Sequence, residues 1–202
     1  MKLNSGYIVT FMIAFVFLSG CATAQQELKD KNVLIVYLSR TKNTKAVAEI
    51  IHKNTGGTLV ELVLANPYPE DYKTIVEQVA KENATGFLPP LKTKIDNIGQ
   101  YDIVFIGFPT WGMQLPPPMK TFLKQYDLSG KTVIPFNTNA GYGVGSGFET
   151  LKTLCTGCSV LNGFSTKGGI ERDGVLFVML GEKEKQVEIE VKKWLQKAAK
   201  AF

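Results

Sequence analysis

Three polar loops, each placed where a buried apolar run ends, carry residue types from which a ligand site could be built. The first loop, residues 39–45 (SRTKNTK), leads from such a run directly into a helical pattern. Hydroxyl and amide side chains, together with the unpaired backbone N–H groups at a helix N-terminus, suit a phosphate monoester. The alternative is an ordinary N-cap, for which one of these residues is enough.

The same loop excludes several other phosphate sites. It lacks the GxxxxGK[ST] pattern of a nucleoside triphosphate site and the GxGxxG pattern of a dinucleotide site. It also holds no cysteine that could attack a phosphate ester and no acidic cluster that could be phosphorylated. The chemistry that remains is the binding of an anion.

The second and third loops carry groups suited to a flat aromatic ligand. Residues 108–113 (FPTWGM) place Trp111 where another buried run ends, and aromatic walls bind heteroaromatic rings. Residues 137–147 (NTNAGYGVGSG) have glycine at four alternate positions, so this segment could wrap a ligand and donate amide hydrogens to it. The alternatives are a Trp111 that packs in the core or against a protein partner, and a mobile surface loop.

The elements that must position these loops alternate between strand and helix patterns. Continuous β-branched runs predict buried strands, and apolar residues at helical spacing predict helices. The expected strands are 32–39, 58–65, 101–108 and 131–138, followed by strand-like runs at 159–165 and 175–180. The expected helices are 44–54, one beginning near Tyr72, 119–126, 148–154, and a last one after residue 180.

This alternation predicts one doubly wound α/β domain with right-handed crossovers. In such sheets ligands bind beyond the carboxyl ends of the strands, near the point where the strand order reverses. Because the loops that begin at Ser39, Phe108 and Asn137 all follow strands, we expect them to meet at one edge of the sheet. Pro135 fits poorly inside the fourth strand, since proline cannot donate a hydrogen bond to a neighbouring strand.

The sequence after the N-terminal segment resembles a flavodoxin over nearly its whole length. The resemblance rests on VLIVYLSRTKNTKAVAEII, PYPEDY, LKTKIDNIGQYDIVFIGFPTWG, PPPMKTFLKQYDLSGKTVIPFNT and the glycine-rich loop. It implies the flavodoxin-like five-stranded parallel sheet in the order 2-1-3-4-5, with helices on both faces. It also implies one noncovalent FMN at the carboxyl edge of that sheet.

The resemblance further assigns residues to the parts of FMN. Contacts to the phosphate are implied for Ser39, Thr41, Asn43 and Thr44, with Lys42 able to add a charge nearby. Positions along the isoalloxazine ring are implied for Pro109, Thr110, Trp111 and Gly112, with Trp111 as a stacking partner. The opposite loop would be formed by Thr138, Asn139, Gly141 and Gly143.

Two features depart from the family pattern. Lys42 stands where many flavodoxins have glycine, so this position either does not need a positive φ or carries strain. The chain is also basic, with a formal net charge of +5, whereas typical flavodoxins are acidic. A positive surface favours an acidic redox partner and predicts a flavin potential less negative than that of an acidic relative.

The N-terminus has the pattern of a bacterial lipoprotein signal. Residues 1–20 combine Lys2, an apolar run from Tyr7 to Leu18 and small residues, as a signal peptide does. The junction Leu18-Ser19-Gly20-Cys21 resembles a lipobox, which implies cleavage before Cys21 and its lipidation. Residues 21–31 would then be a lipidated tether and residues 32–202 the folded domain, held at a membrane of the bacterial envelope, outside the cytoplasm. The alternative is an ordinary secretory signal.

Composition excludes other classes of function. The 23 Lys and Arg residues are spread along the chain, without the dense basic block that nucleic-acid binding requires. A single histidine and three cysteines offer no set of ligands for a metal centre. We therefore predict neither a nucleic-acid partner nor a metal.

These patterns leave three functions open. The first is a membrane-tethered carrier that exchanges electrons through FMN and needs no catalytic residue. The second is an FMN-dependent NAD(P)H oxidoreductase acting on a quinone or a similar acceptor, although reduced nicotinamide is not expected outside the cytoplasm. The third is thiol redox chemistry, or a binding module without flavin, because Cys155 and Cys158 form a CxxC motif and could pair in an oxidising compartment.

Overall fold

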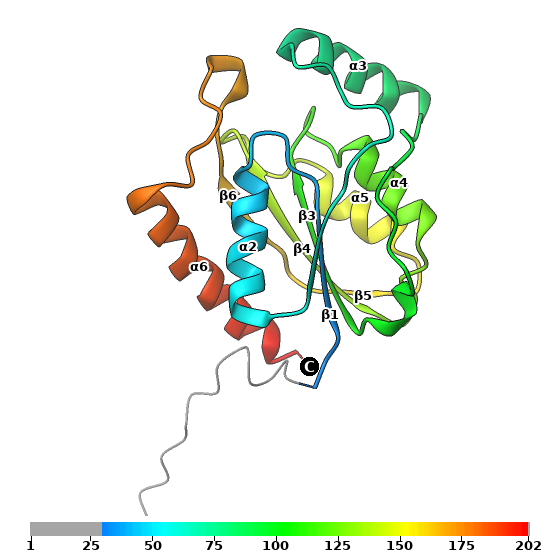
Figure 1. Cartoon of the computed structure of the whole chain (residues 1–202), viewed down its shortest axis with the longest axis vertical. Helices are drawn as coiled ribbons and strands as arrows, with labels where there is room; N and C mark the ends of the chain where they lie inside the picture. The colour runs from blue at the N-terminus through cyan, green and yellow to red at the C-terminus, as the bar shows by residue number, and fades with distance from the viewer. Residues whose placement is uncertain (1–29, 202) are drawn as a thin grey trace, which may run out of the picture.

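Six strands form one parallel sheet in the computed structural model, which describes residues 30–201 (Figure 1). The strands are β1 (Val33–Tyr37), β2 (Thr58–Glu61), β3 (Ile103–Pro109), β4 (Thr132–Asn139), β5 (Ser159–Val160) and β6 (Phe164–Lys167). Their order is β2-β1-β3-β4-β5, and β6 also pairs with β4. The predicted doubly wound architecture and the order 2-1-3-4-5 are confirmed.

The fifth position of the sheet is divided between β5 and β6, and Pro135 explains the division. Val133 and Asn139 of β4 accept hydrogen bonds from Leu161 and Gly168, so the odd-numbered residues of β4 bond toward the fifth position. Pro135 belongs to this set but has no N–H to donate. The neighbouring strand is interrupted opposite it, between Val160 and Phe164. A central strand therefore tolerates proline because its partner is broken there.

Helices cover both faces of the sheet. They are α2 (Asn43–Thr55), α3 (Tyr72–Thr85), α4 (Pro117–Gln125), α5 (Gly147–Leu154) and α6 (Gly181–Ala199), in the labels of Figure 1. Side chains of α2 and α6 pack on one face against Val33 and Ile35, and those of α4 and α5 pack on the other against Leu34 and Val36. The alternation of β1 side chains between two cores is what a strand buried on both faces requires.

Helix α3 belongs to neither of these layers. It lies beyond the carboxyl ends of the strands, at the top of Figure 1. Its buried apolar residues, Ile75 and Val79, are absent from both core clusters. Helix α3 therefore covers the edge of the sheet at which the strands end and the three loops begin.

Three of the expected strands differ in the structure. The run 159–165 is not one strand, because β5 ends at Val160 and β6 begins at Phe164. The run 175–180 is not a strand: Val175 makes one isolated antiparallel bridge to Ile170, and α6 begins at Gly181. No strand lies beside residues 176–180, and Asn43 instead binds the backbone of Leu176 and Val178. The second strand is shorter than expected, because β2 ends at Glu61, where its pairing with β1 ends.

The predicted signal peptide, Cys21 and most of the tether lie outside the described residues. Within residues 30–201, no helix is both long enough and apolar enough to cross a bilayer.

Candidate functional site

The loop between β1 and α2 presents a row of free backbone donors. Within the described residues, no backbone N–H from Arg40 to Thr44 donates a hydrogen bond to another protein group. The next N–H, that of Lys45, is 3.2 Å from the Ser39 hydroxyl and donates to it. Five consecutive unpaired N–H groups at the positive end of a 13-residue helix form a site for an anion. The Ser39 hydroxyl therefore satisfies one N–H of the first helical turn, and the N–H groups before Lys45 remain available.

Lys42 precedes the first residue of α2 and has φ +65° and ψ −3°. This is the left-handed region, in which a side chain is strained and glycine is not. Lys42 thus adopts a backbone conformation that glycine adopts without strain, and its side chain makes this conformation strained. Its side chain is exposed and forms no hydrogen bond within residues 30–201.

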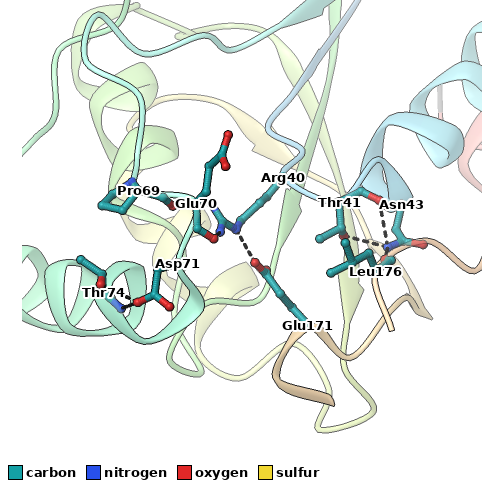
Figure 2. Close-up of polar contacts among 9 residues, drawn as sticks. All are labelled: Arg40, Thr41, Asn43, Pro69, Glu70, Asp71, Thr74, Glu171 and Leu176. Carbon is teal, nitrogen blue, oxygen red and sulfur yellow. Dashed lines mark hydrogen bonds and ion pairs between the residues drawn. The ribbon is translucent and has the colours of Figure 1, made fainter. Parts of the chain in front are cut away.

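Asn43 and Thr44 point into the protein. The Asn43 amide donates to the Thr41 hydroxyl at 2.8 Å and to the Leu176 carbonyl at 2.6 Å (Figure 2). Its side-chain oxygen accepts a hydrogen bond from the Val178 N–H. Asn43 is almost completely buried, with an exposed fraction of 2%. The Thr44 and Thr138 hydroxyls share a hydrogen bond of 2.8 Å in the interior. These two side chains support the loop, which leaves their backbone N–H groups to face an anion.

The second loop continues β3 beyond its pairing with β4. Thr110 donates its N–H to the Thr138 carbonyl at 2.9 Å and its hydroxyl to the Gly143 carbonyl at 3.0 Å. Trp111 is partly buried, and its ring meets that of Tyr68 edge to face at a centroid distance of 5.4 Å. Beyond Trp111, Gly112 is exposed at the rim.

The third loop is folded around Asn139. The side-chain oxygen of Asn139 accepts hydrogen bonds from the N–H groups of Gly141 and Gly143, at 2.8 and 3.1 Å. Gly145 fixes this loop against the second one, because a Cβ at its position would lie 2.1 Å from the Met113 carbonyl oxygen. The glycines therefore form a loop held by specific contacts, with the Tyr142 side chain exposed.

A cavity of about 460 Å³ lies between these loops and α3. Its lining includes eight of the residues predicted from the sequence: Thr41, Asn43, Pro109, Thr110, Trp111, Gly112, Thr138 and Asn139. Gly143 lines an adjoining cavity of about 210 Å³ together with Met113 and Tyr142. Ser39, Lys42, Thr44 and Gly141 line neither cavity, although they belong to the same loops. The structure thus brings the three loops together as expected.

One wall of this cavity is formed by a helix that the sequence patterns do not assign to the site. Helix α3 contributes uncharged side chains to it, among them Ile75, Val76, Val79 and Ala80. The turn at Glu171 and the side chain of Arg40 close the cavity between α3 and the first loop. The apolar spacing of α3 was visible in the sequence, but a helix that faces a cavity has the same periodicity as a helix that faces a core.

Tyr68 links α3 to Trp111. Its hydroxyl donates to the carboxylate of Glu82 on α3, while its ring packs against Trp111. Burial raises the pKa of Tyr68 above its ordinary value near 10, and the hydrogen bond to Glu82 raises it further. Tyr68 is therefore a neutral hydrogen-bond donor that fixes the position of Trp111 relative to α3.

Cys155 and Cys158 form a disulfide in the structure, between the end of α5 and the start of β5. Gly157, inside this motif, accepts a hydrogen bond from Gly130, which precedes β4. The pair thus lies at the amino end of the sheet, whereas the cavity lies at the carboxyl end. No cluster of side chains within residues 30–201 could hold a metal ion.

Comparison with known proteins identifies the fold and the family. A protein from Bacteroides uniformis described as a flavoprotein has 26% identity and a TM-score of 0.67, with 82% of this chain and 98% of that chain covered. A second one, from Bacteroides eggerthii, has 29% identity, a TM-score of 0.66, and coverage of 82% and 96%. A flavoprotein from Lactobacillus acidophilus, solved in complex with FMN, shares the fold at 22% identity and a TM-score of 0.61, with coverage of 67% and 93%.

The sequence matches none of the curated proteins with which it was compared. The family model described as flavodoxin matches residues 32–177, from the start of the sheet to the segment held by Asn43. This match includes all three loops and most of the described domain. The chain belongs to the flavodoxin family.

Proposed function

We propose that this protein is an electron carrier that binds one noncovalent FMN between the carboxyl edge of its sheet and α3. One observation carries the proposal: five unpaired N–H groups at the start of α2 lie beside a cavity walled by Trp111. Membership of the flavodoxin family and the fold shared with an FMN complex support the same cofactor. When bound, FMN supplies the redox chemistry, because its ring accepts and donates electrons.

The residues of the chain bind and orient this cofactor. The N–H groups of residues 40–44 suit the phosphate, since the helix dipole and five aligned donors replace its water shell. Trp111 offers an aromatic surface to the ring, and the apolar side of α3 excludes water from it. Among the residues lining the larger cavity the only charged side chains are Arg40 and Glu171, which pair with each other.

Lipid anchoring through Cys21 is part of the same proposal. The described domain begins at Asp30, beside the amino end of β1, whereas the proposed flavin site lies at the carboxyl end of the sheet. An anchor at residue 21 would thus attach to the end of the domain opposite the flavin. The redox partner would then be reached away from the membrane surface. Fractionation of cells that express the protein or its Cys21→Ser variant tests the anchor: only the first is expected in membranes.

A visible absorption spectrum tests the cofactor. The purified protein is mixed with FMN and desalted, and flavin bands shifted from those of free FMN are expected to remain with it. A folded protein that retains no flavin at micromolar concentration would refute the proposal.

Anaerobic addition of NADPH to the loaded protein distinguishes a carrier from a reductase. A carrier has no route for hydride transfer from nicotinamide, so the flavin absorbance is expected to persist. Rapid bleaching would instead establish an NAD(P)H oxidoreductase on the same fold. Dithionite is the control, because it must bleach the flavin in either case.

A further inference from the structure

Arg40 joins three segments that are far apart in the sequence. Its Nε donates to the Glu171 carboxylate at 2.6 Å, and its two terminal nitrogens donate to the carbonyl oxygens of Pro69 and Glu70 at 2.9 and 2.6 Å. Figure 2 shows the guanidinium between the turn that carries Glu171 and the segment that precedes α3. Both charged side chains are largely buried, with exposed fractions of 19% and 21%. All three nitrogens of the planar guanidinium thus donate a hydrogen bond.

The carbonyls that Arg40 binds lie immediately before α3. Asp71 follows Glu70 and caps the helix, because its carboxylate accepts the Thr74 N–H at 2.8 Å. Arg40 therefore fixes the position at which α3 begins. Since α3 lies outside both cores, its attachment depends on contacts of this kind.

Two further polar contacts attach α3. Tyr68 binds Glu82 near the end of the helix, and the Lys120 ammonium donates to the Asn83 amide oxygen at 2.8 Å. Neither contact reaches the first turn, where Tyr72 and Ile75 line the cavity. Within the described residues, Arg40 is the only residue of the first loop (residues 39–45) whose side chain forms hydrogen bonds to the segment just before α3.

We propose that Arg40 is a positioning residue for FMN binding, which holds the first turn of α3 and the Glu171 turn closed over the cofactor. This inference rests on the proposed function. It gives Arg40 a role that is separate from binding of the phosphate by the first loop. The arginine belongs to the first loop in sequence, yet its guanidinium binds Glu171 and the carbonyls of Pro69 and Glu70, and its charge is paired with that of Glu171. Cofactor release then requires these bonds to open, or α3 to move.

Replacement of Arg40 tests the role through the rate of FMN release. Arg40→Gln removes the charge and the fork, and we expect the dissociation rate of FMN to rise about tenfold or more, since a tenfold change corresponds to about 1.4 kcal/mol, comparable to one hydrogen bond to a charged group. Lys53→Gln is the matched control, because it removes one positive charge and an exposed ion pair between α2 and α6, remote from the cavity. This control is expected to leave the release rate unchanged.

Hydrogen exchange of the protein without FMN separates positioning from general destabilisation. In Arg40→Gln, faster exchange is expected in residues 67–76 and 168–176, with the strands unchanged. Glu171→Gln keeps the two carbonyl contacts of Arg40, so faster exchange is expected only in residues 168–176. If Arg40→Gln does not fold, Arg40→Lys replaces it: one ammonium cannot reach all three partners, and the same pattern is expected in weaker form.

Two results would overturn the inference. One is an FMN release rate in Arg40→Gln within twofold of that in Lys53→Gln. The other is faster exchange spread evenly over the whole domain, which would mark Arg40 as a general stabilising residue. A wild-type protein that binds no FMN would refute the proposed function instead, while the exchange pattern would still report whether Arg40 fastens α3.

Discussion

Lys42→Gly is expected to stabilise the protein, which is unusual for a substitution beside a binding site. The lysine has φ +65°, and a side chain in the left-handed region costs about 1–2 kcal/mol. Glycine removes that cost but adds about 0.4–1 kcal/mol of conformational entropy to the unfolded chain. The Lys42 side chain forms no ion pair within residues 30–201, so little else is lost. The free energy of unfolding should therefore rise by about 0.5–1 kcal/mol.

Urea unfolding of the protein without FMN measures this change, because the cofactor would add its own linkage. The midpoint should rise while the slope stays constant, since the surface exposed on unfolding is the same. Lys45→Gly is the matched control: three residues later the chain is helical, so the same replacement should lower the free energy of unfolding by about 0.5–1 kcal/mol. Equal or lower stability for Lys42→Gly would refute the assignment of strain to this position.

Three further predictions concern the cavity and its supports. Thr44→Val leaves the Thr138 hydroxyl buried without its partner, so the free energy of unfolding should fall by about 1–3 kcal/mol in urea, whereas adding Thr138→Val should recover most of it. A double variant no more stable than the single one would contradict this. Trp111→Ala should weaken FMN binding about tenfold in a fluorescence titration, because an aromatic contact contributes about 0.5–1.5 kcal/mol beyond its buried area; an affinity within twofold of wild type would remove Trp111 from the ring site. Burial and nearby carboxylates raise the pKa of Tyr37 and Tyr68 above the ordinary value near 10, so above that pH the unfolded chain loses protons that the folded chain keeps, and stability should fall as pH rises. Ultraviolet titration of the folded protein should show these two tyrosines ionising only above their ordinary value near pH 10, and ionisation near pH 10 would show that burial does not act as described.

The sheet was predictable because its strands are buried on both faces. A continuous apolar run such as residues 33–37 is typical of a strand covered by helices on both faces of a sheet. The alternation of such strands with helices predicts that the strands are parallel. The carboxyl ends of parallel strands meet at one edge of the sheet, so the positions of the three loops follow from the sequence. Pro135 looked inconsistent with this pattern because a single sequence does not show that the strand beside it is broken.

Helix α3 and the side-chain roles in the first loop were not predictable in the same way. Periodicity predicts that a helix has an apolar face, but it does not say whether that face meets a core or a cavity. Likewise, Asn43 and Thr44 have the right chemistry for a phosphate, and only the structure shows that their side chains bind residues 138, 176 and 178. Such long-range partners leave no local signal in the sequence. The phosphate assignment for this loop therefore remains a prediction, now centred on its backbone.

Net charge is a poor guide to the field at the proposed flavin site. The chain carries +5 overall, and residues 39–45 alone contain three cations. Yet Arg40 is paired with Glu171, and Arg172, at the rim, is paired with Asp173. An ion pair presents a dipole and not a net charge, so its effect on the flavin decays faster with distance than that of a lone lysine. The less negative potential predicted from composition would thus depend on lysines near the loops that form no ion pair within residues 30–201, including Lys167 beside Gly141. Lys42 and Lys45 of the first loop are two of them. Neutralising these two lysines should shift the potential more than neutralising any pair of lysines on α6.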